Sequence, residues 1–369
     1  MKIEPFRLER YFAQHEFSAP YPLCSSDCET LTLGEVLDLE PDARARFEGL
    51  PLGYTESWGA PSLRAGIAAL YTTAQPENIL VHAGAQEAIF NFMNVALDAG
   101  DHAIVHTPCY QSLAEVGRAI GCEVSSWRGD PERGWALDLA DLEALLTERT
   151  RLVVVNLPHN PTGFLPDASF VHRLAALSDS HGFRLFCDEV YRGLEVDPND
   201  RLPAAVDLNE RAVSLGVMSK TYGLAGLRIG WVATRDRALL EKMAAYKDYT
   251  TICNSAPSEF LAELALRHAG VIADRNVEIV RRNLALLDDF FGRHQDVFGW
   301  HRPRAGSVAL PGLKRDSADA FCRDALAKAG VLLLPGTVFE PGLEAVRVGF
   351  GRQNLPECLG HLDAYLQRR

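Results

Sequence analysis

The chain has 369 residues, of which 47% are hydrophobic and 23% are charged, and its formal net charge is −12. This length exceeds the usual size of a single core, so we expect two domains or one enlarged α/β domain. The negative charge argues against nucleic acid as a partner, because phosphates need a basic surface, and against an anionic membrane surface.

The eight cysteines are scattered along the chain, without a C-x-x-C pair or a histidine at zinc-finger spacing. Cys24 and Cys28 are close together, but no second pair follows that would complete a metal site. The first residues lack the apolar region of a signal peptide, and no run reaches the length of a membrane span. We therefore expect a cytoplasmic protein with reduced thiols and no metal.

The middle of the chain alternates between short β-branched runs and segments of helical periodicity. The predicted strands are 79–81, 104–106, 152–155, 184–187, 212–215 and 229–232, and the predicted helices between them include 86–96, 139–146 and 170–178. Such alternation predicts an α/β fold of three layers, in which helices cover both faces of a mostly parallel sheet. Ligands of such folds bind at the carboxyl ends of the strands.

From about residue 251 the pattern changes to long amphipathic helices, at 259–268 and 275–293, and then to short strands at 307–310, 331–334 and 346–348. This pattern predicts a smaller α+β domain. We therefore expect an N-terminal segment (1–50) that packs on the small domain, a large α/β domain (51–250) and a small C-terminal domain (251–369).

The segment Gly84-Ala85-Gln86-Glu87 lies between a predicted strand and a predicted helix. A turn of small residues that begins a helix exposes backbone N–H groups and the positive end of the helix dipole, which suits a phosphate. Tyr110, after the next strand, can stack on an aromatic cofactor or serve as an ordinary core or turn tyrosine. The chain has no G-x-G-x-x-G after a strand, so a dinucleotide site is not supported.

Two further strands end in polar residues. The segment 156–163, NLPHNPTG, fixes a turn with two prolines and a glycine, and this turn can aim Asn160 into a cleft or simply reverse the chain. Asp188 follows the strand 184–187 and precedes Tyr191. A carboxylate there can keep a ring nitrogen protonated, although capping the next helix is the simpler role for Asp188.

Lys220 lies in the segment 218–231, MSKTYGLAGLRIGW, between an apolar strand and a glycine-rich turn. Burial lowers the pKa of a lysine and makes its amine a nucleophile that can form a Schiff base with an aldehyde cofactor. A solvated lysine after a strand is the alternative. Arg228, in the same segment, can supply charge to a phosphate.

Arg347 is a charged residue within the apolar strand 346–348. A buried arginine needs an anion, and a substrate carboxylate or a structural salt bridge meets that need.

In this order and at these separations, the motifs resemble the class I/II aminotransferase family of fold type I pyridoxal-phosphate enzymes, from about Tyr54 to Arg352. The resemblance implies that Lys220 carries the cofactor as a Schiff base and transfers the proton, while Asp188 pairs with the pyridine nitrogen. It further implies the remaining binding roles: Asn160 and Tyr191 at the phenolic oxygen, Ala85, Gln86 and Arg228 at the phosphate, Tyr110 on the ring, and Arg347 at the substrate carboxylate, with Asn160 beside it. Ser219, next to Lys220, can serve as a further ligand of the cofactor. The family forms homodimers with shared sites, so Tyr54 is expected to reach the phosphate of the neighbouring subunit.

The chain departs from the family pattern at two places. The family commonly has Ser or Thr three residues before the lysine as a phosphate ligand, and this chain has Val217 there. The segment 251–254, TICN, lacks the second arginine of members that act on dicarboxylates. In addition, the N-terminal run 23–35 resembles that of capreomycidine synthases, which cyclise a hydroxyarginine, and its Asp27 and Glu29 can suit a basic amine or form a solvated loop.

The leading prediction is an aminotransferase that uses pyridoxal 5'-phosphate and moves an α-amino group from an amino acid to a 2-oxo acid. A β- or γ-eliminating lyase, or a cyclase acting on a basic amino acid, would use the same residues and differ in leaving group and pocket shape. A non-catalytic sensor domain that binds the cofactor is a further alternative, but residues 1–50 show no basic DNA-binding region. A plain α/β binding protein would leave a buried Lys220 and Arg347 unexplained.

Overall fold

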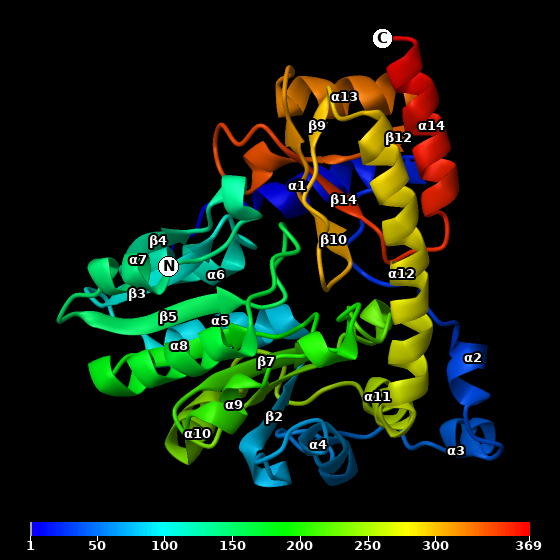
Figure 1. The fold of residues 1–369 in the computed structure, drawn as a ribbon. Coiled ribbons are helices and arrows are strands. Elements are labelled where there is room, and N and C mark those ends of the chain that lie inside the picture. Colours follow the sequence, from blue (N-terminus) through cyan, green and yellow to red (C-terminus); the bar gives the residue numbers. More distant parts are fainter. Residues whose placement is uncertain (1) are drawn as a thin grey trace.

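The computed structural model describes residues 2–369, and a seven-stranded sheet forms the core of its larger part (Figure 1). Its strands are β2 (Ile79–His82), β3 (His102–Thr107), β4 (Glu123–Arg128), β5 (Thr150–Asn156), β6 (Arg184–Asp188), β7 (Val213–Val217) and β8 (Gly230–Ala233). The spatial order is β2-β8-β7-β6-β5-β3-β4. Strand β8 runs antiparallel to β2 and β7, and the other neighbouring pairs are parallel. The predicted mostly parallel sheet is confirmed.

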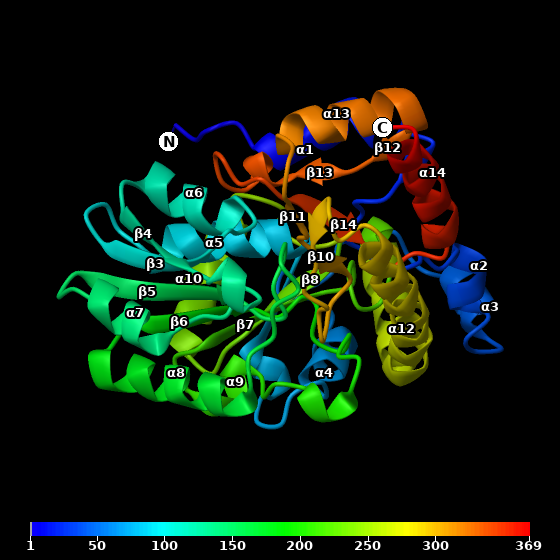
Figure 2. The same ribbon diagram turned by 45° about the horizontal axis from the view of Figure 1, so that its top comes forward.

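Helices cover both faces of this sheet, as Figure 2 shows. On one face lie α5 (Ala85–Ala96), α6 (Ser112–Ile120) and α10 (Arg237–Lys247), which share a core with the strands. On the other face lie α7 (Leu139–Leu145), α8 (Ala168–His181) and α9 (Ala205–Leu208). Helices α4 (Pro61–Ala68) and α11 (Ala256–Arg267) pack together against β2 and β8. Burial on both faces explains why the central strands are apolar runs rather than alternating patterns.

The C-terminal part begins with the long helix α12 (Ala269–Arg293) (Figure 1). The other elements of this part are the strands β9 (Phe298–Gly299), β10 (Val308–Ala309), β11 (Gly312–Leu313), β12 (Val331–Leu332), β13 (Leu334–Pro335) and β14 (Val346–Gly349), and the helices α13 (Ala318–Ala329) and α14 (Leu355–Gln367). Strand β14 lies between β10 and β13 and is antiparallel to both. These elements enclose a core of their own with α12.

The first fifty residues contact both parts of the molecule. Helix α1 (Arg7–His15) packs beside β12 and β13, and β1 (Tyr21–Pro22) pairs with β12 in parallel. Helices α2 (Leu33–Leu37) and α3 (Ala43–Glu48) pack instead on α11. The domain boundaries near residues 50 and 250 stay predictions.

Short 3-10 helices complete the fold, at η1 (Pro76–Asn78), η2 (Pro131–Arg133), η3 (Pro198–Asp200), η4 (Ala225–Leu227) and η5 (Gly336–Val338). Within residues 2–369, no helix has both the length and the apolar character that crossing a bilayer requires. In the same range, no group of three or more His, Cys, Asp and Glu side chains is arranged to hold a metal ion.

Candidate active site

A cavity of about 400 Å³ opens where the carboxyl ends of the parallel strands meet the C-terminal part. This volume is typical of small-molecule sites, which span roughly 300–1,000 Å³. Ten residues predicted from the sequence line it: Ala85, Gln86, Tyr110, Asn160, Asp188, Tyr191, Ser219, Lys220, Arg228 and Arg347. The sheet topology explains this convergence, because β2, β3, β5, β6 and β7 end at one edge and β8 begins there.

One end of the cavity is built for an anion. Ala85 and Gln86 form the first turn of α5, whose backbone N–H groups point out of the helix. Gly84 precedes them with φ +85°, and a Cβ on it would lie 2.6 Å from Nη2 of Arg228, so only glycine fits there. Val217 adds an apolar wall and Ser219 a hydroxyl to the same cavity. The structure thus places a guanidinium and a helix N-terminus together.

Asp188, the last residue of β6, is buried in the cavity wall. Its Oδ1 accepts a hydrogen bond from the backbone N–H of Val190 at 3.2 Å, and Asn156 Nδ2 donates to its backbone oxygen at 2.8 Å. Burial raises the pKa of Asp188 to about 7, because the carboxylate has lost water without gaining an ion pair. A cationic partner would restore the charged form.

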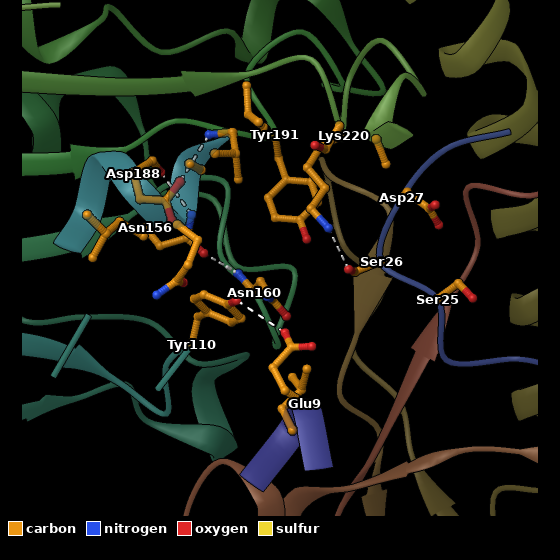
Figure 3. A pocket seen from close by; sticks show the side chains of 18 of the residues that line it. Glu9, Ser25, Ser26, Asp27, Tyr110, Asn156, Asn160, Asp188, Tyr191 and Lys220 are labelled. Carbon is orange, nitrogen blue, oxygen red and sulfur yellow. Dashed lines mark hydrogen bonds between the residues drawn. The ribbon is translucent and has the colours of Figure 1, made fainter. Parts of the chain in front are cut away.

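Lys220 is the third residue after β7, and its amine points into the cavity (Figure 3). Nζ donates to Ser26 Oγ at 2.8 Å. Burial lowers the pKa of the Lys220 amine, while the nearby carboxylates of Asp27 and Asp188 oppose this shift. A buried amine of this kind is readily deprotonated and can act as a nucleophile or a base.

Arg347, on β14, is 1% exposed. Nη1 donates to Asn160 Oδ1 at 3.1 Å and Nη2 donates to the carbonyl of Cys24 at 2.8 Å. The rings of Phe12 and Phe339 lie 5.7 Å and 5.6 Å from its guanidinium carbon. Nε has no hydrogen-bond partner within residues 2–369, and no carboxylate pairs with the guanidinium there. Burial lowers the pKa of Arg347, so a bound anion would be strongly favoured.

In the cavity lining, the hydroxyl of Tyr191 and Oε1 of Gln86 also lack hydrogen-bond partners within the described residues. Burial raises the pKa of Tyr191, so its hydroxyl keeps its proton and can donate it to a ligand. Tyr110 lies across the cavity, where its hydroxyl donates to Glu9 Oε1 at 3.3 Å (Figure 3).

The N-terminal side of the cavity was largely missed by the sequence analysis. Glu9 and Glu16 of the α1 region and Ser26 line it, but no periodicity or motif distinguishes them in the sequence. Desolvation raises the pKa of Glu16, whose carboxylate has no hydrogen-bond or ion-pair partner within residues 2–369. Asp27, which the sequence singled out, also lines the cavity, whereas Glu29 lies outside it and accepts from the backbone of Gln353 at 2.7 Å.

Asp27 is held by a two-pronged ion pair. Arg352 Nε and Nη2 donate to its two carboxylate oxygens at 3.0 Å and 2.9 Å. Asp27 is therefore fixed at the cavity wall and already neutralised in part.

Tyr54 does not line the cavity, and its side chain is 94% exposed. Its expected role in a neighbouring subunit stays a prediction. The segment 251–254 is also outside the cavity lining. The hydroxyls of Thr250 and Thr251 donate to Glu87 Oε1 at 2.6 Å and 2.7 Å.

The donor set fits pyridoxal phosphate. Its phosphate would meet the start of α5 and Arg228, its ring nitrogen the buried Asp188, and its aldehyde the Lys220 amine. The unpartnered Tyr191 hydroxyl supplies a hydrogen-bond donor beside these groups. Asp188 is buried without an ion pair and the Tyr191 hydroxyl is unpartnered within the described residues, and a polar ligand would satisfy both. Arg228 is exposed, and its Nη1 donates only to the carbonyl of Ala225 in its own turn.

Comparison with known proteins agrees with this geometry. Residues 20–359 match the family model "Aminotransferase class I and II". Capreomycidine synthase of Streptomyces vinaceus is 32% identical over 348 residues, which is 93% of this chain and 88% of that protein.

Two solved structures have closely similar folds. A PLP-dependent aminotransferase from Streptococcus suis 89-1591 superposes with a TM-score of 0.94 and 32% identity, covering 100% of this chain and 99% of that chain. The PLP-dependent cyclase OrfR gives a TM-score of 0.92 and 29% identity, covering 100% and 98%.

Proposed function

Because the chain belongs to the class I and II aminotransferases and its cofactor is pyridoxal 5'-phosphate, we propose that it transaminates an α-amino acid with a cationic side chain. The observation that carries this substrate class is the acidic N-terminal wall of the cavity, formed by Glu9, Glu16 and Asp27.

The cofactor supplies an aldehyde that joins to an amine and a ring that withdraws electrons from the substrate Cα. Asp188 would pair with the protonated ring nitrogen, since a buried carboxylate with a raised pKa gains most from a cation. Lys220 would hold the cofactor through its amine and, when that amine is free, would take the proton from the substrate Cα and return it. Burial lowers the pKa of that amine, which favours the unprotonated form that the first of these steps needs.

The substrate carboxylate binds to Arg347. This guanidinium is preorganised by Asn160 and Cys24 and lacks an acidic partner within the described residues. A carboxylate that accepts two hydrogen bonds from it would complete its ion pair. Binding of the substrate carboxylate to Arg347 would orient the substrate so that its Cα–H bond faces Lys220.

The side chain of the substrate then extends toward α1. There Glu16 is half-buried and unpaired, Glu9 accepts one hydrogen bond from Tyr110, and Asp27 is shared with Arg352. A guanidinium or ammonium group would stabilise the charged form of Glu16, whereas a second carboxylate would be repelled. No additional cation comes from the segment 251–254, so dicarboxylates are poor candidates.

Incubating the holoenzyme with 2-oxoglutarate and single amino acids tests the proposal. We expect arginine, ornithine or lysine to yield glutamate and the matching 2-oxo acid faster than aspartate, leucine or phenylalanine. Absence of glutamate with every donor would contradict transamination, and a preference for aspartate would contradict the substrate class.

Cyclisation of a cationic amino acid is the second candidate. Its support is the 32% identity to capreomycidine synthase and the likeness to the cyclase OrfR. Such a reaction needs a leaving group on Cβ and consumes no 2-oxo acid. Turnover of a 3-hydroxylated arginine without an acceptor, with loss of one water per substrate, would favour the cyclase over the aminotransferase.

We also propose a homodimer. The surface that carries Tyr54 is rich in exposed apolar side chains, with Leu52 84%, Tyr249 92% and Ile252 53% exposed. Contact with a second copy would bury them. Light scattering on the eluted protein tests this assembly, and a monomer at micromolar concentration would contradict it.

A further inference from the structure

Ser26 is a polar residue of the cavity to which the proposed reaction assigns no role. It lies 194 residues before Lys220 in the chain, yet its Oγ accepts the hydrogen bond of the Lys220 amine at 2.8 Å (Figure 3). The neighbouring carboxylate of Asp27 is occupied by Arg352 through two hydrogen bonds. Within residues 2–369, Ser26 is therefore the hydrogen-bond partner of the Lys220 amine.

The segment 23–29 that carries Ser26 is fixed by contacts with the C-terminal part. Gly349 N–H donates to the carbonyl of Leu23 and Ser307 Oγ to the carbonyl of Ser26, both at 2.8 Å. Glu29 N–H donates to the carbonyl of Gly351, also at 2.8 Å. A Cβ on Gly349 would collide with the Ser25 backbone, so the segment lies directly against β14.

Because its segment is fixed, Ser26 is suited to hold the flexible side chain of Lys220 in one orientation. The lysine side chain has many rotamers, and its amine is useful as a base only while it faces the substrate Cα. A fixed acceptor at 2.8 Å selects the rotamers that keep Nζ in the cavity. The hydroxyl adds no charge, so it leaves the amine free to lose and regain a proton.

We propose that Ser26 is a positioning residue for the proton transfer: its hydroxyl holds the amine of Lys220 whenever that amine is not bonded to the cofactor. This inference rests on the proposed function, because it assumes that Lys220 moves the Cα proton. The proposed role of Ser26 is the same whether transamination or cyclisation follows the proton transfer.

The test compares Ser26→Ala with Ser26→Thr, which keeps the hydroxyl, and with Ser178→Ala. Ser178 is a matched control, since it is a buried serine remote from the cavity whose Oγ donates one hydrogen bond of 2.8 Å to Phe183. In steady-state assays with arginine and 2-oxoglutarate, we expect Ser26→Ala to lower kcat about 10- to 100-fold, as misplacement of a reacting group does, with KM nearly unchanged. The kinetic isotope effect of α-deuterated arginine should rise, and Ser26→Thr should recover most of the rate.

A second measurement does not need turnover. In the cofactor-free protein, the rate at which acetic anhydride acylates Lys220, followed against pH by peptide mass spectrometry, gives the pKa of the Lys220 amine. Losing an acceptor of the ammonium form should lower this pKa in Ser26→Ala and leave it unchanged in Ser178→Ala.

An unchanged kcat and isotope effect in Ser26→Ala would overturn the proposal, and so would a raised KM with an unchanged isotope effect, which would assign Ser26 to substrate binding. If the wild type transaminates no amino acid, the proposed function fails. The dependence of Lys220 acylation on pH, compared between the wild type and Ser26→Ala, still shows whether Ser26 binds the Lys220 amine. An unchanged profile would then overturn that contact as well.

Discussion

The two walls of the cavity are built in different ways. The sheet wall consists of strand ends, so Asp188, Asn156 and the turn after β7 are positioned by backbone pairing across the sheet. The N-terminal wall consists of α1 and the segment 23–29, which the short β1–β12 pairing, single backbone hydrogen bonds and side-chain packing attach to the C-terminal part. The sheet wall supplies the groups for the reaction, and the N-terminal wall supplies the acids and Ser26. Under the proposed function, the sheet wall carries the reacting groups, while the N-terminal wall selects the substrate and positions Lys220.

The largest effect is expected on the sheet wall. Lys220→Ala removes both the attachment point of the cofactor and the base, so turnover should fall about 10,000-fold. Borohydride reduction followed by peptide mapping should find a pyridoxyl group on Lys220 in the wild type and none in the variant. Lys242→Ala, on the exposed face of α10, is the control and should keep the label. A label on another lysine would contradict the assignment.

Arg347 joins the two walls, because it donates to Asn160 on one and to Cys24 on the other. Arg347→Lys keeps a charge but loses the planar pair of donors, so kcat/KM should fall about 10- to 100-fold for every amino acid. The loss should be independent of the substrate side chain. A loss confined to cationic substrates would place Arg347 at the side chain instead of the carboxylate.

Glu189, the residue after Asp188 at the end of β6, makes the folding stability of the protein depend on pH. Glu189 is buried on the opposite side from the cavity lining, and burial raises its pKa from 4.5 to about 7. The folded state therefore binds a proton more tightly than the unfolded state, and this contribution to stability is lost as pH rises from about 4.5 through 7. Between pH 5 and 7.5 the loss amounts to roughly 2 kcal/mol.

Urea unfolding of the cofactor-free protein measures this contribution. The decrease in unfolding free energy between pH 5 and 7.5 should be smaller by that amount in Glu189→Gln. Equal decreases in the two proteins would show that Glu189 titrates normally.

Among these effects, the smallest is expected on the N-terminal wall. Glu16→Gln should lower kcat/KM for arginine about 3- to 10-fold, because Glu16 is only half-buried and its interaction is partly screened. The rate with leucine should stay the same. Glu48→Gln, on the exposed side of α3, is the control. If Glu16→Gln lowered kcat/KM for leucine as much as for arginine, Glu16 would not select the substrate side chain, and the proposed role of the N-terminal wall would be contradicted.

Much of the sheet could be predicted from the sequence, because buried parallel strands are short apolar runs with turns at their ends. The predicted runs at 79–81, 104–106, 152–155 and 184–187 lie within β2, β3, β5 and β6. Strand β4 was not predicted, since Glu123–Arg128 lies at the edge of the sheet and is mostly polar. Asn160, Asp188 and Lys220 could be predicted to lie together, because the carboxyl ends of neighbouring parallel strands meet at one edge of the sheet.

The N-terminal wall could not be predicted in the same way. Glu16 and Ser26 reach the cavity only because β1 pairs with β12 and α1 packs beside β13, contacts that span more than 300 residues. No local periodicity encodes them. The same reason explains why Asp27 and Glu29, two residues apart, seemed equivalent in the sequence, although Asp27 alone of the two lines the cavity.

In the proposed function, the cavity recognises the positive charge on the side chain of an amino-acid substrate. The most direct test compares arginine with citrulline, which has nearly the same shape and no charge, under identical conditions with the holoenzyme. We expect kcat/KM to be at least about 10-fold higher for arginine, as suits a charged group that meets Glu16, a carboxyl without an ion-pair partner within residues 2–369. Equal values, or a preference for citrulline, would contradict the claim.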